Sequence, residues 1–314
     1  MREFSRDVKN FVIRKTASDQ LHIVASAALI VAIVTIVVLK RTFWTPDVLL
    51  ILVLLIGLAL GKTRELALRF IPFFGLLLVY ESMRSVADDI NTYVNYMPMI
   101  QFDLAVFGEL PTITLQRLLW HGSVQWYDFY LYGLYIVHFL VPAALALVFW
   151  KWRPRLYWPF VGSIVGISFA AFVVYMLFPA APPWLAAQKG LISGQFEHVT
   201  PHIWAAMNVT NYSEVYGKLS PNLVAAVPSL HATYPSIVVI FCVLAFGIKR
   251  TWWLFLYPIS MWIGIVYLGE HYMFDIVASF ALMVTFFGVY ITALLVRQRR
   301  AQSVKAELPA TAAA

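Results

Sequence analysis

Charged residues are scarce in this sequence: Asp, Glu, Lys and Arg make up only 12% of its 314 residues. A soluble globular protein carries roughly 25%, so this chain lacks the polar side chains needed to cover a water-facing surface. Hydrophobic residues make up 61%, and many of them occur in long runs. The shortage of charge excludes an ordinary soluble protein and predicts an all-α, polytopic transmembrane helical bundle.

Cysteine is almost absent, and acidic residues are outnumbered by basic ones. The single cysteine, Cys242, excludes an internal disulfide. The formal charge of +7 would indicate a nucleic-acid partner in a soluble protein. In a membrane protein the same excess is typical of basic loops beside lipid headgroups. We therefore expect lipid partners and no nucleic acid.

Eight apolar runs approach the length of about 20 residues that a helix needs to cross a bilayer. They predict spans near residues 20–39, 46–61, 66–83, 127–150, 156–178, 230–248, 252–268 and 272–296. Six or seven spans are the alternative, because the second run is short and the last two almost touch. We expect a basic cytoplasmic segment over residues 1–19, one transmembrane domain over 20–300 and a disordered tail over 301–314.

The distribution of positive charge tests this number of spans. With the amino terminus in the cytoplasm, the cytoplasmic segments are 1–19, 62–65, 151–155, 249–251 and 297–314. With Arg69 counted in the second of them, they hold 17 of the 23 Lys and Arg residues. The positive-inside rule predicts this asymmetry. Lys40 and Arg41 are exceptions, which a shallow re-entrant pair of helices would explain. Two long loops, residues 84–126 and 179–229, then lie on the extracytoplasmic (or lumenal) face, and loops of that length usually have a function.

Two short polar stretches stand at the starts of otherwise apolar runs. Residues 227–233 read VPSLHAT and open the sixth predicted span, and residues 267–275 read YLGEHYMFD and open the eighth. In the eight-span topology both spans begin on the extracytoplasmic face. The two stretches are therefore expected at the same depth, where they can form one site.

His271 and Asp275 are four residues apart, so on a helix they project from one face with Cβ atoms about 5–6 Å apart. The carboxylate can accept the proton on one imidazole nitrogen and leave the other nitrogen free to attack an electrophile. An aspartate inside a spanning helix costs roughly 2.5–3.5 kcal/mol, so it needs a partner or a function. A structural His–Asp pair that joins helices is the alternative, and the pair alone does not decide between them.

His231 adds a second imidazole, in the first turn of a helix that Ser229 can cap and Pro228 can begin. Backbone N–H groups at such a helix start favour a phosphate oxygen. A second histidine can also give a proton to a departing oxygen, which is worth about 10²–10⁴-fold in rate. A histidine that only caps its helix is the alternative. Taken together, the two stretches predict a phosphoryl-transfer site whose catalytic residues are His271, His231 and Asp275.

These motifs resemble the type 2 phosphatidic acid phosphatase superfamily, especially its inositol phosphorylceramide synthase-like branch. Residues 228–231 look like the family's Pro-Ser-x-His motif, and His271 with Asp275 looks like its final His-x-x-x-Asp motif. The resemblance runs from about residue 70 to 295. It implies that His271 is the nucleophile that forms a phosphohistidine, that Asp275 orients it, that His231 is the acid, and that no metal or other cofactor takes part.

Other segments are similar to the synthase-like branch alone. The proline-rich stretch 178–184 resembles one of its segments, and 127–138 is similar to its aromatic helix that ends in a His-Phe pair. The hydrolase branch differs, because it has a Ser-Arg pair where this chain has Gly264 and Ile265. Its Lys and Arg-Pro motif is missing too, since Arg153-Pro154 lies in a predicted cytoplasmic loop. These differences argue against a simple phosphatase.

Some cation should still face the phosphate, and Arg84, at the outer end of the third span, is the candidate. An arginine that only extends its charge to the lipid headgroups is the alternative. The candidate substrate-binding residues are Arg84, Tyr80, Ser229, Pro183, Trp184 and His138. His138 is expected mid-helix, where a packed structural histidine is the alternative. Glu270 either tunes His271 or lies in solvent, and a metal site on Glu270, His271 and Asp275 lacks further spaced ligands.

The leading hypothesis is a membrane lipid phosphotransferase. It moves a phospho-headgroup, by resemblance phosphoinositol, from a membrane phospholipid to a lipid or sugar alcohol through a phosphohistidine. The lipid is expected to enter laterally between the third, fourth, sixth and eighth spans. A lipid or polyprenyl phosphate phosphatase that uses water as the acceptor is the alternative. A non-enzymatic transporter or scaffold, in which the His–Asp pair conducts protons or joins helices, is the third hypothesis.

Overall fold

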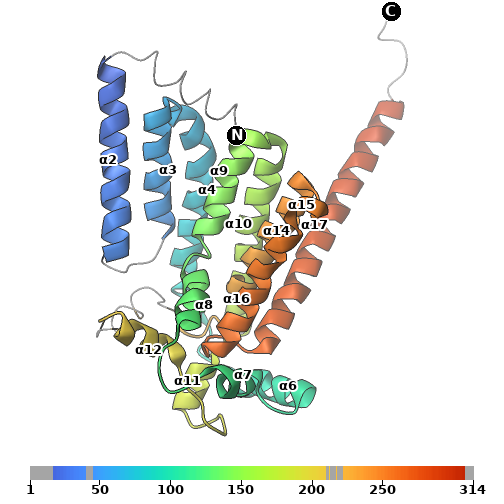
Figure 1. Ribbon diagram of the computed structural model, residues 1–314. Helices are drawn as coiled ribbons and strands as arrows, with labels where there is room; N and C mark the ends of the chain where they lie inside the picture. The colour runs from blue at the N-terminus through green and yellow to red at the C-terminus, as the bar shows by residue number, and fades with distance from the viewer. Residues whose placement is uncertain (1–16, 40–44, 210–211, 213–216, 218–221, 308–314) are drawn as a thin grey trace, which may run out of the picture. The chain divides into compact units, whose positions relative to one another are not determined.

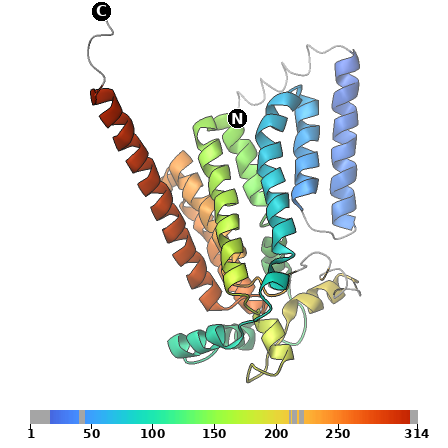
Figure 2. The same ribbon diagram turned by 180° about the vertical axis from the view of Figure 1, so that it is seen from behind.

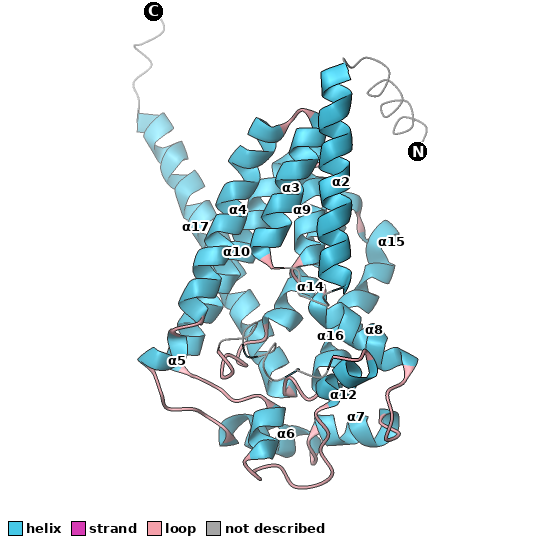
Figure 3. Ribbon diagram, turned by 90° about the vertical axis from the view of Figure 1, so that its left-hand side faces the viewer, coloured by secondary structure: helices cyan, strands magenta, loops and turns pink. Residues whose placement is uncertain are grey.

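The computed structural model describes residues 17–39, 45–209, 212, 217 and 222–307, and every regular element among them is a helix (Figure 3). Isolated backbone bridges, such as the one between Asn95 and Ala180, are the only β-type pairing in this described part. Each of the eight predicted apolar runs coincides with at least one helix. The all-α prediction is confirmed.

The contacts divide the chain into two compact units. The first comprises residues 1–83 and 136–161, of which 1–16 and 40–44 lie outside the described residues. Its helices are α2 (Ala17–Leu39), α3 (Pro46–Leu60), α4 (Thr63–Arg84, up to residue 83), α9 (Leu140–Trp152) and the start of α10 (Pro154–Leu177). The predicted basic segment, apart from its last three residues, and the exceptional Lys40 and Arg41 therefore fall outside the described residues.

Aromatic packing and a half-buried polar contact help to hold this first unit together. Phe70 of α4 meets Tyr157 of α10 edge to face, with ring centroids 5.5 Å apart. The indole N–H of Trp150 donates to a carboxylate oxygen of Glu65 at 2.8 Å. Close α3–α4 packing needs Gly57, because a Cβ there would lie 3.1 Å from Leu66.

The second unit comprises residues 84–135 and 162–314, and it contains both histidine motifs. Its longer helices, α14 (Leu230–Phe246), α16 (Leu256–Tyr267) and α17 (Met273–Glu307), run alongside one another, while α6 (Met97–Phe107) and α7 (Pro111–Leu119) lie across their ends (Figures 1 and 2). The remaining elements are α5 (Ala87–Ile90), α8 (Trp126–Ile136), the rest of α10, α11 (Pro183–Gln188), α12 (Val199–Ala206), α15 (Ile248–Thr251) and the 3-10 helix η1 (Trp252–Phe255).

Three helical segments of the described chain are long and apolar enough to cross a membrane: Thr63–Ile90, Pro154–Leu177 and Met273–Ala293. Helices α8 and α9 would make a fourth if they form one broken span. The other predicted spans coincide with helices that are shorter or less completely described. Eight spans, six or seven spans, and the side of the membrane on which each loop lies therefore stay predictions.

Two predicted elements differ from the structure. The predicted helix over 127–150 is interrupted at residues 137–139, so His138 lies in a break between α8 and α9 and not mid-helix. The reason is Pro142, which has no N–H to donate to the carbonyl of His138. At the other end of the chain, α17 continues into the predicted tail as far as Glu307, and residues 308–314 lie outside the described part.

Candidate active site

The first histidine motif is fixed by a capped helix start. The Ser229 side chain accepts a hydrogen bond from the Ala232 N–H at 3.3 Å, which makes Ser229 the N-cap of α14, as predicted. The hydroxyl of Tyr175 on α10 donates to the Pro228 carbonyl at 2.8 Å. His231 therefore stands in the first turn of α14, on backbone that is held on both sides.

The second motif is a tight turn between α16 and α17. The carbonyl of Ile265 accepts from the N–H groups of both Glu270 and His271, each at 3.0 Å. Gly269 has φ +82°, and a Cβ there would lie 2.7 Å from the ring of Phe196, so only glycine fits without displacement. The Gly269 carbonyl in turn accepts the Trp184 N–H at 3.1 Å. The turn that presents His271 is thus tied to the start of α11.

His271 and Asp275 form the predicted pair. The two residues are separated by 2.9 Å between the ring Nδ1 and carboxylate Oδ2, and Asp275 is fully buried. The same oxygen accepts the Tyr272 N–H at 3.0 Å. An ionised carboxylate only accepts, so with Asp275 ionised the proton of the neutral His271 ring lies on Nδ1 and Nε2 keeps its lone pair. The arrangement can therefore supply a nitrogen nucleophile.

The two histidines lie next to each other. The ring centroids of His231 and His271 are 5.7 Å apart, with the ring planes tilted by 52°. The ring of Tyr135, on α8, stacks on the His231 imidazole. The two ring centroids are 4.1 Å apart and the angle between the ring planes is 9°. A stacked tyrosine fixes the plane of the imidazole.

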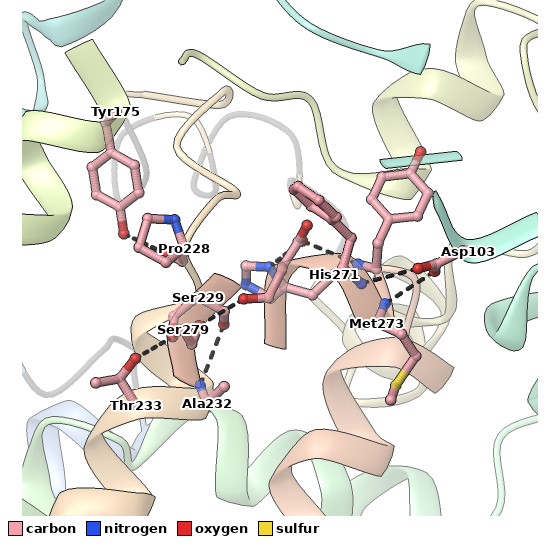
Figure 4. A network of polar contacts seen from close by, with 12 residues as sticks. Asp103, Tyr175, Pro228, Ser229, Ala232, Thr233, His271, Met273 and Ser279 are labelled. Carbon is pink, nitrogen blue, oxygen red and sulfur yellow. Dashed lines mark hydrogen bonds and ion pairs between the residues drawn. The ribbon is translucent and has the colours of Figure 1, made fainter. Parts of the chain in front are cut away.

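Ser279 joins the two motifs directly. Its hydroxyl lies 2.9 Å from the Ser229 carbonyl on the α14 side and 2.7 Å from the Asp275 carbonyl on its own helix (Figure 4). The Ser229 carbonyl also accepts from Thr233 of α14. One buried hydroxyl therefore holds the start of α14 against the first turns of α17 and keeps the imidazoles close.

Glu270 does not lie in solvent, so that alternative is wrong: the residue is only 3% exposed. Its Oε1 lies 3.0 Å from His198 Nε2 and 2.6 Å from the Thr200 hydroxyl. Burial by itself would raise the pKa of Glu270, but the charge of His198, the hydrogen bonds of His198 and Thr200, and nearby His271 outweigh burial and lower it. A buried negative charge thus stands near His271.

The predicted substrate-binding residues fall into three groups. Ser229 serves as the helix cap, and Pro183 begins α11 with the buried Trp184 beside it. The Trp184 ring stacks on His198, with ring centroids 5.2 Å apart, and His198 is a hydrogen-bond partner of Glu270.

Arg84 is the last residue of α4 and is half-buried. Its backbone carbonyl accepts a hydrogen bond from the Asn222 side chain at 3.0 Å. Tyr80 and His138 belong to the first compact unit. Substrate contact stays a prediction for all six residues.

Sequence reasoning missed three residues that support the site: Ser279, Tyr135 as a stacking partner, and Asp103. Ser279 is four residues beyond Asp275 and eight beyond His271, so the helical spacing could have indicated it. Asp103 of α6 accepts from the N–H groups of Met273 and Phe274. Its position three residues after buried Ile100, on the apolar face of α6, is a signal of burial.

Gly264 and Ile265, which replace the Ser-Arg pair of the hydrolase branch, have packing roles. A Cβ at Gly264 would lie 3.3 Å from Leu131, so glycine lets α16 approach α8 closely. Ile265 is fully buried. Within the described part of the chain, no three His, Cys, Asp or Glu side chains are grouped in a way that could hold a metal ion.

Comparison with known proteins was made for the whole chain. Residues 100–289, more than half of the chain, match the family model described as PAP2 superfamily. A phosphoinositol dihydroceramide synthase of Bacteroides thetaiotaomicron is 26% identical over 231 residues, which cover 68% of this chain and 73% of the relative. An inositol phosphorylceramide synthase of Candida albicans is 25% identical over 236 residues, covering 72% of this chain and 48% of that protein. No solved structure matches.

The matched stretch contains the capped Pro-Ser-Leu-His turn and the buried His271–Asp275 pair. The chain has the long apolar helices of a membrane protein, and its relatives are named as synthases of inositol-containing sphingolipids. The chain therefore belongs to the PAP2 superfamily, in its inositol phosphorylceramide synthase-like branch, as an integral membrane enzyme of the type 2 phosphatidic acid phosphatase kind.

Proposed function

We propose that this enzyme transfers phosphoinositol from an inositol phospholipid to the hydroxyl group of a ceramide-type lipid, through a phosphohistidine at His271. The observation that carries the proposal is the pair of imidazoles 5.7 Å apart, one of them bonded through Nδ1 to a buried aspartate. That geometry supports a nucleophile and an acid that act on one reacting centre. The names of the two relatives supply the headgroup and the class of acceptor.

In the first half-reaction, Nε2 of His271 attacks the phosphorus of the donor lipid. The bond between phosphorus and the glycerol oxygen breaks, and that oxygen takes a proton from His231 to leave as diacylglycerol. Asp275 stabilises the positive charge that develops on His271, since its oxygen holds the Nδ1 proton. The products are diacylglycerol and an enzyme-bound phosphoinositol.

In the second half-reaction, the acceptor hydroxyl gives its proton to His231 as its oxygen attacks the phosphorus. The nitrogen–phosphorus bond breaks, which returns His271 to its starting form. The product released is the ceramide-type acceptor with phosphoinositol on its hydroxyl oxygen. His231 thus acts as acid and then as base, and ends each cycle protonated. The start of α14, with its positive dipole end beside His231, favours phosphate oxygens throughout.

Transfer is favoured over hydrolysis because Gly264 and Ile265 occupy the positions of the hydrolase branch's Ser-Arg pair. Gly264 and Ile265 provide packing and no positive charge. A phosphodiester carries less negative charge than a phosphomonoester, so it needs less neutralisation. Both relatives are named as synthases, which is consistent with an alcohol as the acceptor.

The test is a headgroup-transfer assay on the full chain in lipid vesicles that contain phosphatidylinositol with labelled phosphorus and dihydroceramide. We expect labelled phosphoinositol dihydroceramide and an equal amount of diacylglycerol. His271→Ala should abolish both products, while His121→Ala, at an exposed position, should leave them unchanged. Free inositol phosphate as the only labelled product would establish hydrolysis instead. Unchanged conversion in folded His271→Ala would contradict the proposed nucleophile.

A further inference from the structure

Asp103 makes a contact that the proposed chemistry does not use. It lies on α6, and its two carboxylate oxygens accept backbone hydrogen bonds from Met273 at 3.0 Å and from Phe274 at 2.9 Å. Asp103 has no exposed surface. Each oxygen of this buried carboxylate accepts a hydrogen bond from a different backbone N–H, so Asp103 caps the start of α17 (Figure 4).

The two N–H groups belong to the first turn of α17. Such groups have no partner within their own helix, so they must be satisfied from outside it. Ordinarily a side chain just before the helix does this, but here the cap comes from a helix 170 residues earlier in the sequence. The neighbouring rings of Phe102 and Phe274 meet edge to face with centroids 5.1 Å apart. Helix α6 thus holds the start of α17 by two adjacent contacts.

The turn that Asp103 caps is the one that orients the proposed nucleophile. Asp275 lies in that turn, and its Oδ2 is shared between the His271 ring and the Tyr272 N–H. Two more backbone donors, on the half-buried residues Met273 and Phe274, follow in the chain. Without Asp103 they would need another acceptor, and Asp275 is a carboxylate near enough for its charge to affect Asp103. A shift of Asp275 toward them would weaken its bond to His271.

We propose that Asp103 is a positioning residue for His271: by satisfying the Met273 and Phe274 N–H groups, it leaves the Asp275 carboxylate to the imidazole. Asp103 acts through the helix start, by way of the Met273 and Phe274 N–H groups. The kinetic consequence rests on the proposed function. The structural consequence, a weaker His271–Asp275 hydrogen bond, does not.

The variants are Asp103→Ala, which removes both acceptor oxygens, and Asp103→Asn, which keeps the size and one acceptor oxygen. The matched control is Glu109→Gln, because Glu109 is a carboxylate of the same outer segment that pairs with Arg117 and Thr114 and not with α17. Thermal melting in detergent establishes which variants are folded. Should Asp103→Ala fail to fold, Asp103→Asn alone decides the test.

The direct measurement is proton NMR of protein labelled with ¹⁵N-histidine, without substrate. The His271 Nδ1–H that bonds to Asp275 should give a low-field line, assigned by its absence in His271→Gln. We expect this line in the original protein and in Glu109→Gln, a shift to higher field or exchange broadening in Asp103→Asn, and its loss in Asp103→Ala. An unchanged line in folded Asp103 variants would overturn the proposal.

The transfer assay adds a second measurement. Partners that orient a reacting group through its ligand or neighbour typically matter by 10–100-fold, so we expect kcat to fall about 10-fold in Asp103→Asn and about 100-fold in Asp103→Ala. KM should stay within about twofold, because the lipid contacts are intact. A fall confined to KM would overturn the positioning role. If the original protein transfers no headgroup while the NMR line still responds to Asp103, the proposed function fails and the positioning inference stands.

Discussion

At the scale of single residues, the chemistry of this site follows from where protons and lone pairs can be. Asp275 is buried and its Oδ2 lies 2.9 Å from Nδ1 of His271, so Nε2 is the nitrogen that the proposed mechanism uses as the nucleophile. His231 is stacked under Tyr135 and has its ring centre 5.7 Å from that of His271. Each imidazole therefore has a different neighbour, and the two rings are suited to different steps.

Asp275→Asn keeps the size of the side chain and removes its charge. An amide can donate to Nδ1, which would place the ring proton on Nε2 and block the nucleophile. We expect kcat to fall by about 10⁴-fold, as for the equivalent change in a serine–histidine–aspartate site, while KM changes little. Steady-state transfer kinetics on folded protein measure this. A loss smaller than about tenfold would mean that Asp275 does not orient His271.

Tyr135→Leu removes the ring that stacks on His231, and Tyr135→Phe keeps it. Since the stacked ring fixes the plane of the His231 imidazole, the leucine variant should lose this orientation and its kcat should fall, whereas kcat of the phenylalanine variant should stay close to the original value. Steady-state transfer kinetics on folded protein are the readout. Equal kcat in all three proteins would contradict the role of the stack.

The residues that the sequence identifies correctly are those whose pattern is local. Ser229 as a cap, and His271 with Asp275 on one helix face, follow from spacings of a few residues. Asp103 and Tyr135 were not identified as site residues, because their partners are 170 and 96 residues away in the chain. No periodicity links positions so far apart.

At the scale of elements, the turn between α16 and α17 is the most constrained segment of the site. Gly269→Ala would need a left-handed conformation that costs about 1–2 kcal/mol. Its Cβ would also lie 2.7 Å from the Phe196 ring. We expect a lower melting temperature and a lower kcat together, since the turn carries His271. Gly288→Ala is the control, because nothing lies within 4 Å of its added Cβ. Equal melting temperatures for the two variants would contradict this account of the turn.

The contact between α6 and α17 gives a pH dependence to stability. Burial raises the pKa of Asp103 from 3.8 to about 6, against the lowering effect of its two backbone hydrogen bonds, and the charge of Asp275 raises it further. The ionisable groups that face it are Asp275 and Tyr272. Between these two pH values the folded state binds more protons at Asp103 than the unfolded state does.

Stability from this group is thus fully present below about pH 3.8 and is lost as pH rises through about 6. Asp103→Asn has no proton to lose. The free energy of unfolding of the original protein should therefore fall, relative to that of Asp103→Asn, as the pH rises from about 4 to about 7. Denaturant titrations in detergent across this range measure the difference. A difference that stays constant with pH would show that the Asp103 pKa is not raised.

Helix existence was predictable from the apolar runs, but the ends and interruptions were less so. The break at 137–139 depends on Pro142, because proline has no N–H to donate to the carbonyl of the residue four positions earlier, His138. The extension of α17 to Glu307 reflects helix-forming Ala, Gln, Lys and Glu residues in a stretch that is no longer apolar. Hydrophobicity identifies where a helix meets lipid, and it does not identify where the helix ends.

At the scale of the whole molecule, the placement of loops on either side of the membrane rests on the distribution of Lys and Arg. It predicts that Asp89, in the long loop 84–126, and Arg155, in a short basic loop, face opposite sides. Single cysteines at these exposed positions, in a Cys242→Ser background, test this with a membrane-impermeant maleimide. Asp89→Cys should be labelled only from the extracytoplasmic side and Arg155→Cys only from the cytoplasmic side. Labelling of both from one side would contradict the topology.

The convergence of the two motifs is the feature of the whole molecule that matters most. Forty residues of chain separate His231 from His271, yet hydrogen bonds from Ser279 and Tyr175 fix both motifs in one place. The sequence predicted this meeting from a shared membrane depth. It could not predict the bonds that enforce it, because they depend on how α10, α14 and α17 pack.

The most direct measurement of the central claim is to trap the covalent intermediate. Full-length protein in vesicles is mixed with phosphatidylinositol carrying labelled phosphorus, without acceptor, then quenched in alkali and analysed by peptide mass spectrometry. We expect labelled phosphoinositol on His271, none in His271→Asn, and loss of the label when dihydroceramide is added before the quench. Full transfer activity with no label on His271, or with the label on another residue, would contradict the account.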